Sequence, residues 1–336
     1  VAVFKPTRQG LLDGILSLVG ARSAVSFEGL DVQILGRPAL RWPTSVVLRG
    51  YEVRQEQGRA VHVHKLELDG KLLELTATLW TEGAGLRIAL ACPERLTDFA
   101  LGAADQEAPV VYYGHGYRIV NPKGFRAGFG GHNLSTSHVG CDFAGGLSLL
   151  QAVDVPPDYF EVSPQSRRYA LHSHMNGTLT LVPSEKGAFD CAIKYRPLYD
   201  KKPAGGVQRL AGRFCFDIWG GKYRTIADQM AEMIRYGLTD SFLTVHVWQR
   251  WGYDYRLPDI WPPNPDLGTI EDMCRIGQVC DPPDIPWGLH DNYIDFYPDA
   301  TGYTYNHICF TADGQPIKAW FNEGRDAQSY RWRPDA

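Results

Sequence analysis

The chain has 336 residues, of which 44% are hydrophobic and 12% are aromatic, and its formal net charge is −4 at pH 7. This composition is typical of an ordered globular protein, and the length is sufficient for two domains. The negative net charge gives no electrostatic support for a nucleic-acid partner or for an anionic membrane surface. No apolar segment approaches the roughly 20 residues needed to cross a bilayer, so we expect no membrane partner.

Residues 1–215 carry many short strand patterns. The segments 60–66, 73–79 and 86–90 alternate apolar and polar residues with period two, as half-buried antiparallel strands do. Turn signals such as Asn176-Gly177 occur between the strand patterns of this region. A further strand is predicted at 189–195. Because helical periodicity is almost absent, we expect a large antiparallel β-sandwich over this region.

The pattern changes from period two to period 3.6 after residue 215. We therefore predict a linker strand and helix over 216–240, with the helix running from about Tyr223 to Tyr236 and ending at Gly237. This segment marks the expected boundary between two domains.

Residues 241–336 have the order expected of βαβ units. A strand from Ser241, a helix over about 269–278 and a strand over 287–291 are predicted, followed by a hairpin around Asp313-Gly314 and a helix near Glu323. A complete (β/α)8 barrel needs roughly 250 residues. We therefore expect only the N-terminal, truncated part of a barrel here.

Polar and aromatic side chains gather where the strands of this second region end, which is where sites form in such folds. Aromatic faces stack on the C–H surfaces of sugars, and charged or amide side chains bind pairs of hydroxyls. The alternative is structural, with aromatics in the core and charges in solvent. The expected substrate-binding residues are His246, Trp248, Arg250, Trp251, Tyr253, Asp254, His290, Asn292, Asp295, Tyr297, Trp320 and Asn322.

Other chemistries find less support. No ligand spacing of a known metal site occurs, and we expect neither a metal nor a cofactor. Glu323 could act as a general acid, but a solvated acidic helix start explains it equally well. The seven scattered cysteines suit buried thiols better than a disulfide framework, which slightly favours the cytoplasm. The ends of the chain do not look natural, so its localisation stays open.

Three motifs carry a resemblance to a known group of enzymes: Trp248-x-x-Trp-Gly-Tyr-Asp254, Gly288-Leu-His-Asp-Asn-Tyr293 and Trp320-Phe-Asn322. With the order of the domains, they resemble glycoside hydrolases that place a mutarotase-like β-supersandwich before a (β/α)8 barrel. Within that group the chain is most similar to the endo-α-N-acetylgalactosaminidase family and its α-galactosidase-like relatives. The family pattern of Asn, then Thr or Ser, then Glu is replaced here by Asp291-Asn-Tyr-Ile-Asp295, which implies a different sugar or branch.

The resemblance implies a retaining glycosidase with a carbohydrate substrate of the α-galactoside or α-N-acetylgalactosaminide type. On this analogy Asp254 holds sugar hydroxyls, His290 lines the same pocket and Trp320 covers it. The nucleophile and the acid/base are expected beyond Ala336, and Asp254 and Glu323 are the alternatives within the chain.

Two other functions stay open. The chain could be a non-catalytic carbohydrate-binding protein in which the sandwich binds the ligand. It could also be a mutarotase-type sugar epimerase that uses sandwich histidines such as His115 and His172.

Overall fold

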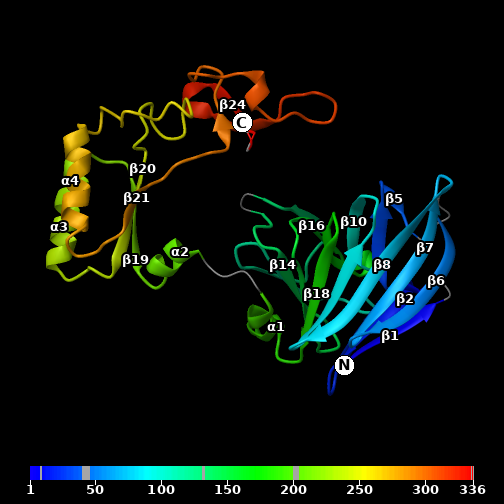
Figure 1. Ribbon diagram of the computed structural model, residues 1–336. Helices are drawn as coiled ribbons and strands as arrows, with labels where there is room; N and C mark the ends of the chain where they lie inside the picture. Colours follow the sequence, from blue (N-terminus) through cyan, green and yellow to red (C-terminus); the bar gives the residue numbers. More distant parts are fainter. Residues whose placement is uncertain (8–9, 40–45, 131–132, 200–203, 334, 336) are drawn as a thin grey trace. The chain divides into compact units, whose positions relative to one another are not determined.

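The computed structural model describes the whole chain except residues 8–9, 40–45, 131–132, 200–203, 334 and 336 (Figure 1). The contacts between residues divide it into two compact units, Val1–Lys201 and Lys202–Ala336. No helix in the described ranges is both long enough and apolar enough to span a membrane.

Three antiparallel sheets build the first unit. The largest contains, in spatial order, β12 (Tyr117–Val120), β11 (Val110–Tyr113), β14 (His138–Asp142), β15 (Ser148–Val153), β18 (Gly177–Ser184), β9 (Gly85–Ala91), β8 (Lys71–Glu82), β7 (Arg59–Leu68) and β6 (Val46–Glu56). The second contains β13 (Phe125–Gly128), β16 (Pro157–Ser163), β17 (Arg168–Ser173), β10 (Leu96–Leu101), β4 (Leu30–Ile34) and β5 (Arg37–Pro38). The third contains β1 (Ala2–Thr7), β2 (Gly10–Val19) and β3 (Ala24–Phe27).

The apolar positions of these strands share one core. Four fully buried side chains illustrate this core, and all belong to a single cluster. They are Leu75 and Ile88 of the largest sheet and Phe160 and Leu171 of the second. Burying one such side chain stabilises the fold by about 1.5–3 kcal/mol. The expected β-rich region with large antiparallel sheets, consistent with a β-sandwich, is therefore confirmed.

The strand predicted at 189–195 is wrong, because Ala188–Tyr195 forms helix α1. Phe189, Cys191 and Ile193 look like a period-two strand, but Phe189 and Ile193 are 80% and 59% exposed. The helix instead buries Ala188 and Cys191 at i, i+3 spacing, and Asp190 pairs with Lys194 at 2.7 Å across one turn. A 3₁₀ turn (Arg196–Leu198) follows.

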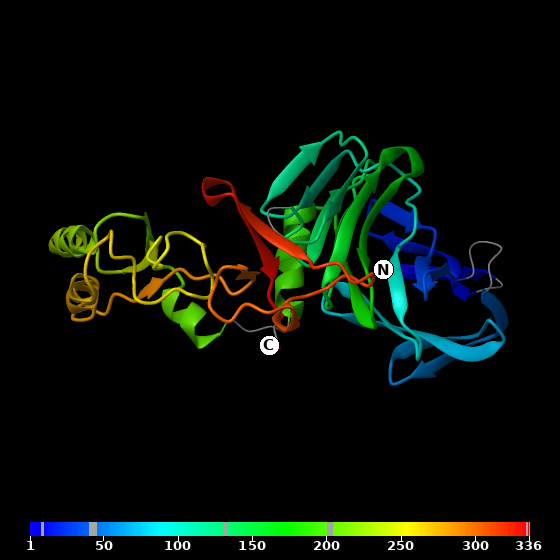
Figure 2. The same cartoon turned by 90° about the horizontal axis from the view of Figure 1, so that it is seen from above.

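A parallel sheet organises the second unit, in the order β19 (Phe214–Trp219), β20 (Ser241–His246) and β21 (Trp287–Leu289). Helices α3 (Tyr223–Arg235) and α4 (Ile270–Cys280) lie side by side next to it (Figures 1 and 2). A short helix, α2 (Gly205–Leu210), precedes the sheet.

The predicted helices of this unit have clear physical causes. Helix α3 buries Tyr223, Ile226 and Met230 against the sheet, and Gly237 follows its end with φ +83°. Helix α4 begins at a capping box, in which Thr269 accepts a hydrogen bond from the Asp272 N–H and the Asp272 carboxylate accepts one from the Thr269 N–H.

The last residues form an antiparallel sheet in the order β22 (Asp295–Phe296), β24 (Ala327–Arg331) and β23 (Lys318–Asn322). The helix predicted near Glu323 is wrong: Glu323–Arg325 is a single 3₁₀ turn, and Asp326 turns the chain into β24 with φ +50°. A second 3₁₀ turn covers Tyr305–His307. Of the predicted hairpin, an isolated bridge joins Phe310 and Pro316.

The segment 216–240 is part of the second unit's core. Strand β19 pairs with β20 along its whole length, and α3 packs against α4. The truncated (β/α)8 barrel stays a prediction.

Candidate functional site

Three rings lie side by side where the parallel strands end. Trp219 is the register partner of His246, and His290 follows Leu289, the partner of Val245. Residues in register on parallel strands project from the same face, about 4.8 Å apart. Accordingly, the Trp219 and His246 ring centroids are 4.0 Å apart, and those of His246 and His290 are 4.3 Å apart. We call these three residues the ring ladder.

Two further aromatic residues extend the ring ladder. The ring of Tyr253 lies 5.8 Å from that of His290 and 5.1 Å from that of Trp219. Trp320, on β23, approaches Tyr253 edge-on at 6.2 Å and is 41% exposed. Aromatic and imidazole surfaces from four segments therefore meet beside the strand ends.

The Asp217 carboxylate anchors the ring ladder from β19. His246 Nε2 donates to one of its oxygens at 2.7 Å, and Trp219 Nε1 donates to the other at 2.8 Å. The hydrogen bond from Trp219, followed by that from His246, lowers the pKa of Asp217 from its ordinary value of 3.8. Asp217 is therefore an ionised, solvent-facing acceptor at neutral pH.

A second group of polar residues lies next to His290. Asn292 Nδ2 donates to Asp254 Oδ2 at 3.0 Å and to Asp295 Oδ2 at 2.5 Å, so one amide bridges two carboxyl groups. Gln249 Nε2 also faces Asp254 Oδ1 at 3.4 Å. We call Asp254, Asn292 and Asp295 the carboxyl clamp.

The two carboxyl groups of the clamp differ in environment. Burial raises the pKa of Asp254, and the hydrogen bond from Asn292 opposes that shift. Asp295 is tied to the scaffold, because its other oxygen accepts from Ser329 Oγ at 2.8 Å and from the Trp320 N–H at 3.2 Å. Asp254 is thus the member best able to exchange its partners for a ligand.

Two features of the site lower the free energy of unfolding. His246 Nδ1 and Gln249 Oε1 are buried and have no hydrogen-bond partner within the described part of the chain. Such atoms usually have a partner, and leaving one unpaired costs about 1–3 kcal/mol. Val247, directly after His246, holds φ +62°, a conformation that is strained for a β-branched residue.

The structure brings together His246, Tyr253, Asp254, His290, Asn292, Asp295 and Trp320 of the predicted site residues. Three others lie in the interior. Trp248 is 5% exposed in the core, where its Nε1 donates to the His290 carbonyl at 2.6 Å. Tyr297 and Asn322 are 0% and 8% exposed.

Among the described residues, no hydrogen bond or ion pair joins Arg250, Trp251 or Glu323 to the clamp. The guanidinium groups of Arg250 and Arg256 lie 4.8 and 4.4 Å from the centre of the Trp251 ring, and Trp251 Nε1 donates to Asp259 at 3.2 Å. Glu323 is exposed at the 3₁₀ turn before β24.

Asp217 and Trp219 were not among the predicted site residues, because their segment read as a linker. A signal was nevertheless present. The sequence Phe214-Cys-Phe-Asp-Ile-Trp219 ends an apolar run in a carboxylate and an aromatic residue, as the run before His246 ends in polar and aromatic residues.

The sandwich histidines lie on different sheets. His115 is exposed in the turn between β11 and β12. His172, on β17, is 4% exposed and is hydrogen-bonded to Asp98 at 2.9 Å and to Glu161 at 3.1 Å.

The fold matches solved structures of glycoside hydrolases. The GalNAc complex of the alpha-N-acetylgalactosaminidase NagBb from Bifidobacterium bifidum aligns with a TM-score of 0.66 and 14% identity over 95% of this chain. The GH36 alpha-galactosidase AgaA from Geobacillus stearothermophilus aligns with a TM-score of 0.51 and 11% identity over 92% of this chain. The predicted resemblance to these enzymes holds at the level of the fold.

The match covers only part of each neighbour. This chain spans 63% of the NagBb chain and 49% of the AgaA chain. No family model matches the sequence, and no curated protein matches it. The likeness therefore establishes the glycosidase-like fold.

Proposed function

We propose that this chain forms the β-sandwich and the sugar-recognition part of a retaining glycosidase that acts on α-linked galactose or N-acetylgalactosamine. The observation that carries the proposal is the ring ladder beside the carboxyl clamp at the C-terminal ends of three parallel strands. Binding sites of α/β folds form at this edge. The structural neighbours include complexes with GalNAc and with Gal-NHAc-DNJ, which supports a carbohydrate ligand.

The ring ladder offers a surface on which a pyranose can stack. Trp219 is 60% exposed although His246 stacks on it and the Tyr253 ring lies 5.1 Å away, so much of its ring remains accessible to a C–H surface. The ionised Asp217 carboxylate beside it accepts hydrogen bonds from sugar hydroxyls. Trp320, partly exposed and close to Tyr253, covers the ligand in this proposal.

The carboxyl clamp supplies directional recognition. A carboxylate and a primary amide together present acceptors and donors that fit two neighbouring hydroxyls of one ring. Asp254 and Asn292 form such a pair, and Asp295 holds the Asn292 amide from the opposite side. The unpaired Gln249 Oε1 and His246 Nδ1 are further atoms that a hydroxyl or water can satisfy.

Retaining hydrolysis needs a nucleophilic carboxylate and an acid/base about 5–5.5 Å apart. Asp295 does not suit either role, because both of its oxygens already accept hydrogen bonds from the scaffold and from Asn292. We therefore assign the clamp to binding and expect the catalytic pair from residues beyond Ala336. The raised pKa of Asp254 makes it the alternative acid within the chain.

The test is hydrolysis by the protein encoded by the complete reading frame. We expect release of aryl leaving groups from α-N-acetylgalactosaminide or α-galactoside and none from the matching β-glycosides. Asp254→Asn keeps the size and the left-handed backbone of φ +46° that Asp and Asn both tolerate. It should lower kcat/KM at least tenfold, because one hydrogen bond to a charged group contributes about 1.5–3 kcal/mol.

Tyr236→Ala is the matched control, because Tyr236 is 73% exposed at the end of α3 and belongs to neither the ladder nor the clamp. Its kcat/KM should equal that of the unmodified protein. Failure to cleave any α-glycoside, or full activity of Asp254→Asn, would contradict the proposal. Sugar binding without turnover would favour the carbohydrate-binding protein instead.

A further inference from the structure

The first unit contains a cavity of about 560 Å³. This volume lies within the range of about 300–1,000 Å³ typical of small-ligand sites. Three segments enclose it: the stretch before β14, the corner between β15 and β16, and the segment from α1 through the 3₁₀ turn after it. The lining residues are Phe129, Ser135, Thr136, Ser137, His138, Asp154, Val155, Pro156, Pro157, Ala192, Tyr195, Arg196 and Tyr199.

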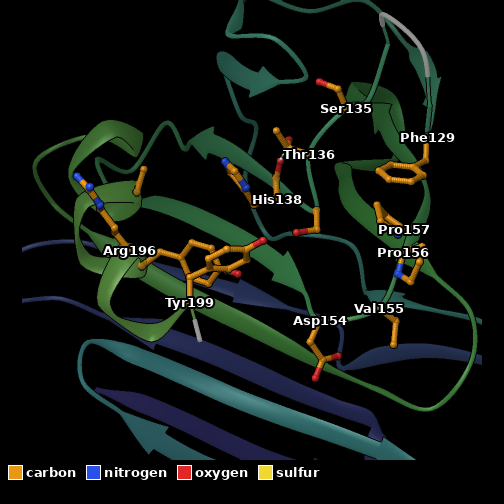
Figure 3. Close-up of a pocket in the computed structure, with 13 residues that line it drawn as sticks. Phe129, Ser135, Thr136, His138, Asp154, Val155, Pro156, Pro157, Arg196 and Tyr199 are labelled. Carbon is orange, nitrogen blue, oxygen red and sulfur yellow. Dashed lines mark hydrogen bonds between the residues drawn. The ribbon is translucent and has the colours of Figure 1, made fainter. Parts of the chain in front are cut away.

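The walls of the cavity differ in chemistry. Figure 3 shows Tyr199 and Arg196 on one side, and Phe129, Pro156 and Pro157 on the other. The rings of Tyr195 and Tyr199 lie 6.0 Å apart at 60° to each other, so two faces of different orientation are presented. Such walls suit a ligand with a flat apolar surface.

A polar strip lies between these walls. Ser135, Thr136 and Ser137 follow one another, and His138 completes the strip (Figure 3). No hydrogen bond of the His138 ring to another described residue occurs, and Tyr195 lies 6.0 Å from it. Burial lowers the pKa of His138, so its imidazole is neutral at pH 7 and offers one donor and one acceptor. Hydroxyl groups and a neutral imidazole suit a ligand that carries hydroxyls better than a ligand that carries a charge.

The scaffold holds this strip in place. The Val153 N–H donates to the Ser137 carbonyl at 2.9 Å, and Thr136 Oγ1 donates to the His138 carbonyl at 2.8 Å. Asp154 is fixed by the Thr178 N–H, which donates to Asp154 Oδ1 at 2.6 Å. A site whose groups are already ordered loses less entropy when it binds a weakly held ligand.

Other ligand classes fit less well. Arg196 is the only Lys or Arg among the lining residues that the structure describes, which is too little positive charge for a nucleic acid or a polyphosphate. No group of three or more His, Cys, Asp or Glu side chains in the described ranges could hold a metal ion. A neutral molecule with one apolar face and several hydroxyls remains.

We infer that this cavity is a carbohydrate subsite of the sandwich, which binds one pyranose unit on Tyr195 and Tyr199 with its hydroxyls toward Ser135–His138. The described residues of the subsite come from the first unit, whereas those of the ring ladder come from the second. This subsite holds a sugar without taking part in bond cleavage.

The test uses the whole chain and saturation-transfer NMR with galactose, N-acetylgalactosamine, N-acetylglucosamine and glucose, followed by titration of the sugar with the strongest signal. All proteins carry Asp254→Asn, so that binding at the ring ladder and clamp is weakened. Tyr199→Ala should raise the Kd about tenfold or more, and Tyr199→Phe should stay within about twofold, because the ring and not the hydroxyl stacks.

Tyr117→Ala is the matched control. Tyr117 is 47% exposed and Tyr199 is 46% exposed, but Tyr117 does not line the cavity. Its Kd should be unchanged. An unchanged Kd in Tyr199→Ala, or no saturation transfer to any of the four sugars, would overturn the subsite. Loss of binding in Tyr199→Ala would support it even if Asp254→Asn left hydrolysis intact, so the two proposals fail separately.

Discussion

The two units reach order by different means. The first unit joins its sheets through one large apolar core, and none of the buried polar side chains described in it is an Asp, Glu, Lys or Arg. The second has a smaller core between a three-stranded parallel sheet and two helices, and it also buries the carboxyl groups of Asp254 and Asp295. The first unit therefore depends on packing and the second on hydrogen-bonded side chains, which are more costly to bury.

This comparison predicts that removing a large apolar side chain from the sandwich core has the largest effect on stability. Phe160 is 0% exposed, and its ring lies 6.1 Å from that of Phe125. Phe160→Ala should lower the free energy of unfolding of the first unit by about 3–5 kcal/mol. Urea titration followed by far-UV circular dichroism, which senses the β-rich unit, measures this loss.

Tryptophan fluorescence separates the units in the same titration. Seven of the nine tryptophans lie in the second unit: Trp219, Trp248, Trp251, Trp261, Trp287, Trp320 and Trp332. The fluorescence transition should stay in place while the dichroism transition moves. If the fluorescence and dichroism transitions move together, the two units unfold cooperatively, and the stability of the second unit is not independent of the core of the first.

The next largest effect is expected at the carboxyl clamp. Asn292→Ala removes the amide that donates to both Asp254 and Asp295. It should destabilise the second unit by about 1–3 kcal/mol, because buried acceptors lose a partner. Tyr293→Ala, at a neighbouring residue that is 79% exposed, is the control and should leave the fluorescence transition unchanged.

A smaller effect is expected at the start of α4. Thr269→Ala removes the side chain that accepts from the Asp272 N–H at 3.1 Å, which should cost about 1 kcal/mol. Thr269→Ser keeps the hydroxyl and should cost much less. Equal losses in the two variants would mean that the methyl group, and not the cap, is responsible.

The smallest effect is a change in the pH dependence of the sandwich. Burial alone would lower the pKa of His172, but hydrogen bonds to Asp98 and Glu161 outweigh it, so the pKa is raised above 6.5. A raised pKa gives stability that is complete below about pH 6.5 and is lost as the pH rises through the folded-state value.

The opposite sign holds for the partner carboxylate. The hydrogen bond from His172 lowers the pKa of Glu161, so its contribution is present above its ordinary pKa and is lost as the pH falls. His172→Gln should therefore flatten the fall in stability that begins above about pH 6.5, measured as the urea midpoint of the dichroism transition. An unchanged slope would show that His172 is neutral throughout.

Much of the fold could be predicted from local patterns. Period-two alternation located the strands of the sandwich, and Thr269 and Gly237 located the ends of two helices. The pattern failed at 189–195 because three apolar residues in alternation do not reveal which of them face solvent. It failed at Glu323 because a left-handed Asp326 can start a strand where an acidic residue suggests a helix.

The site was predictable only in part. The strand ends that carry His246 and His290 were visible as polar residues after apolar runs. The pairing of β19 with β20 was not visible, because register between distant segments depends on tertiary packing. For that reason Asp217 and Trp219 were missed, and Tyr297, which resembles a site residue in sequence, lies fully buried.

The cysteines of the two units differ in how accessible their thiols are to a reagent. Cys92, Cys141 and Cys191 of the first unit are buried, and burial raises the pKa of Cys191 to about 12. Cys215 and Cys274 of the second unit are exposed. Because the thiolate is the reacting species, a thiol reagent will modify the exposed pair in the native state and reach the sandwich thiols only when that unit opens. The rate of modification at Cys92, Cys141 and Cys191, separated by peptide mapping from that of the buried Cys280 in the second unit, therefore records how often the sandwich opens.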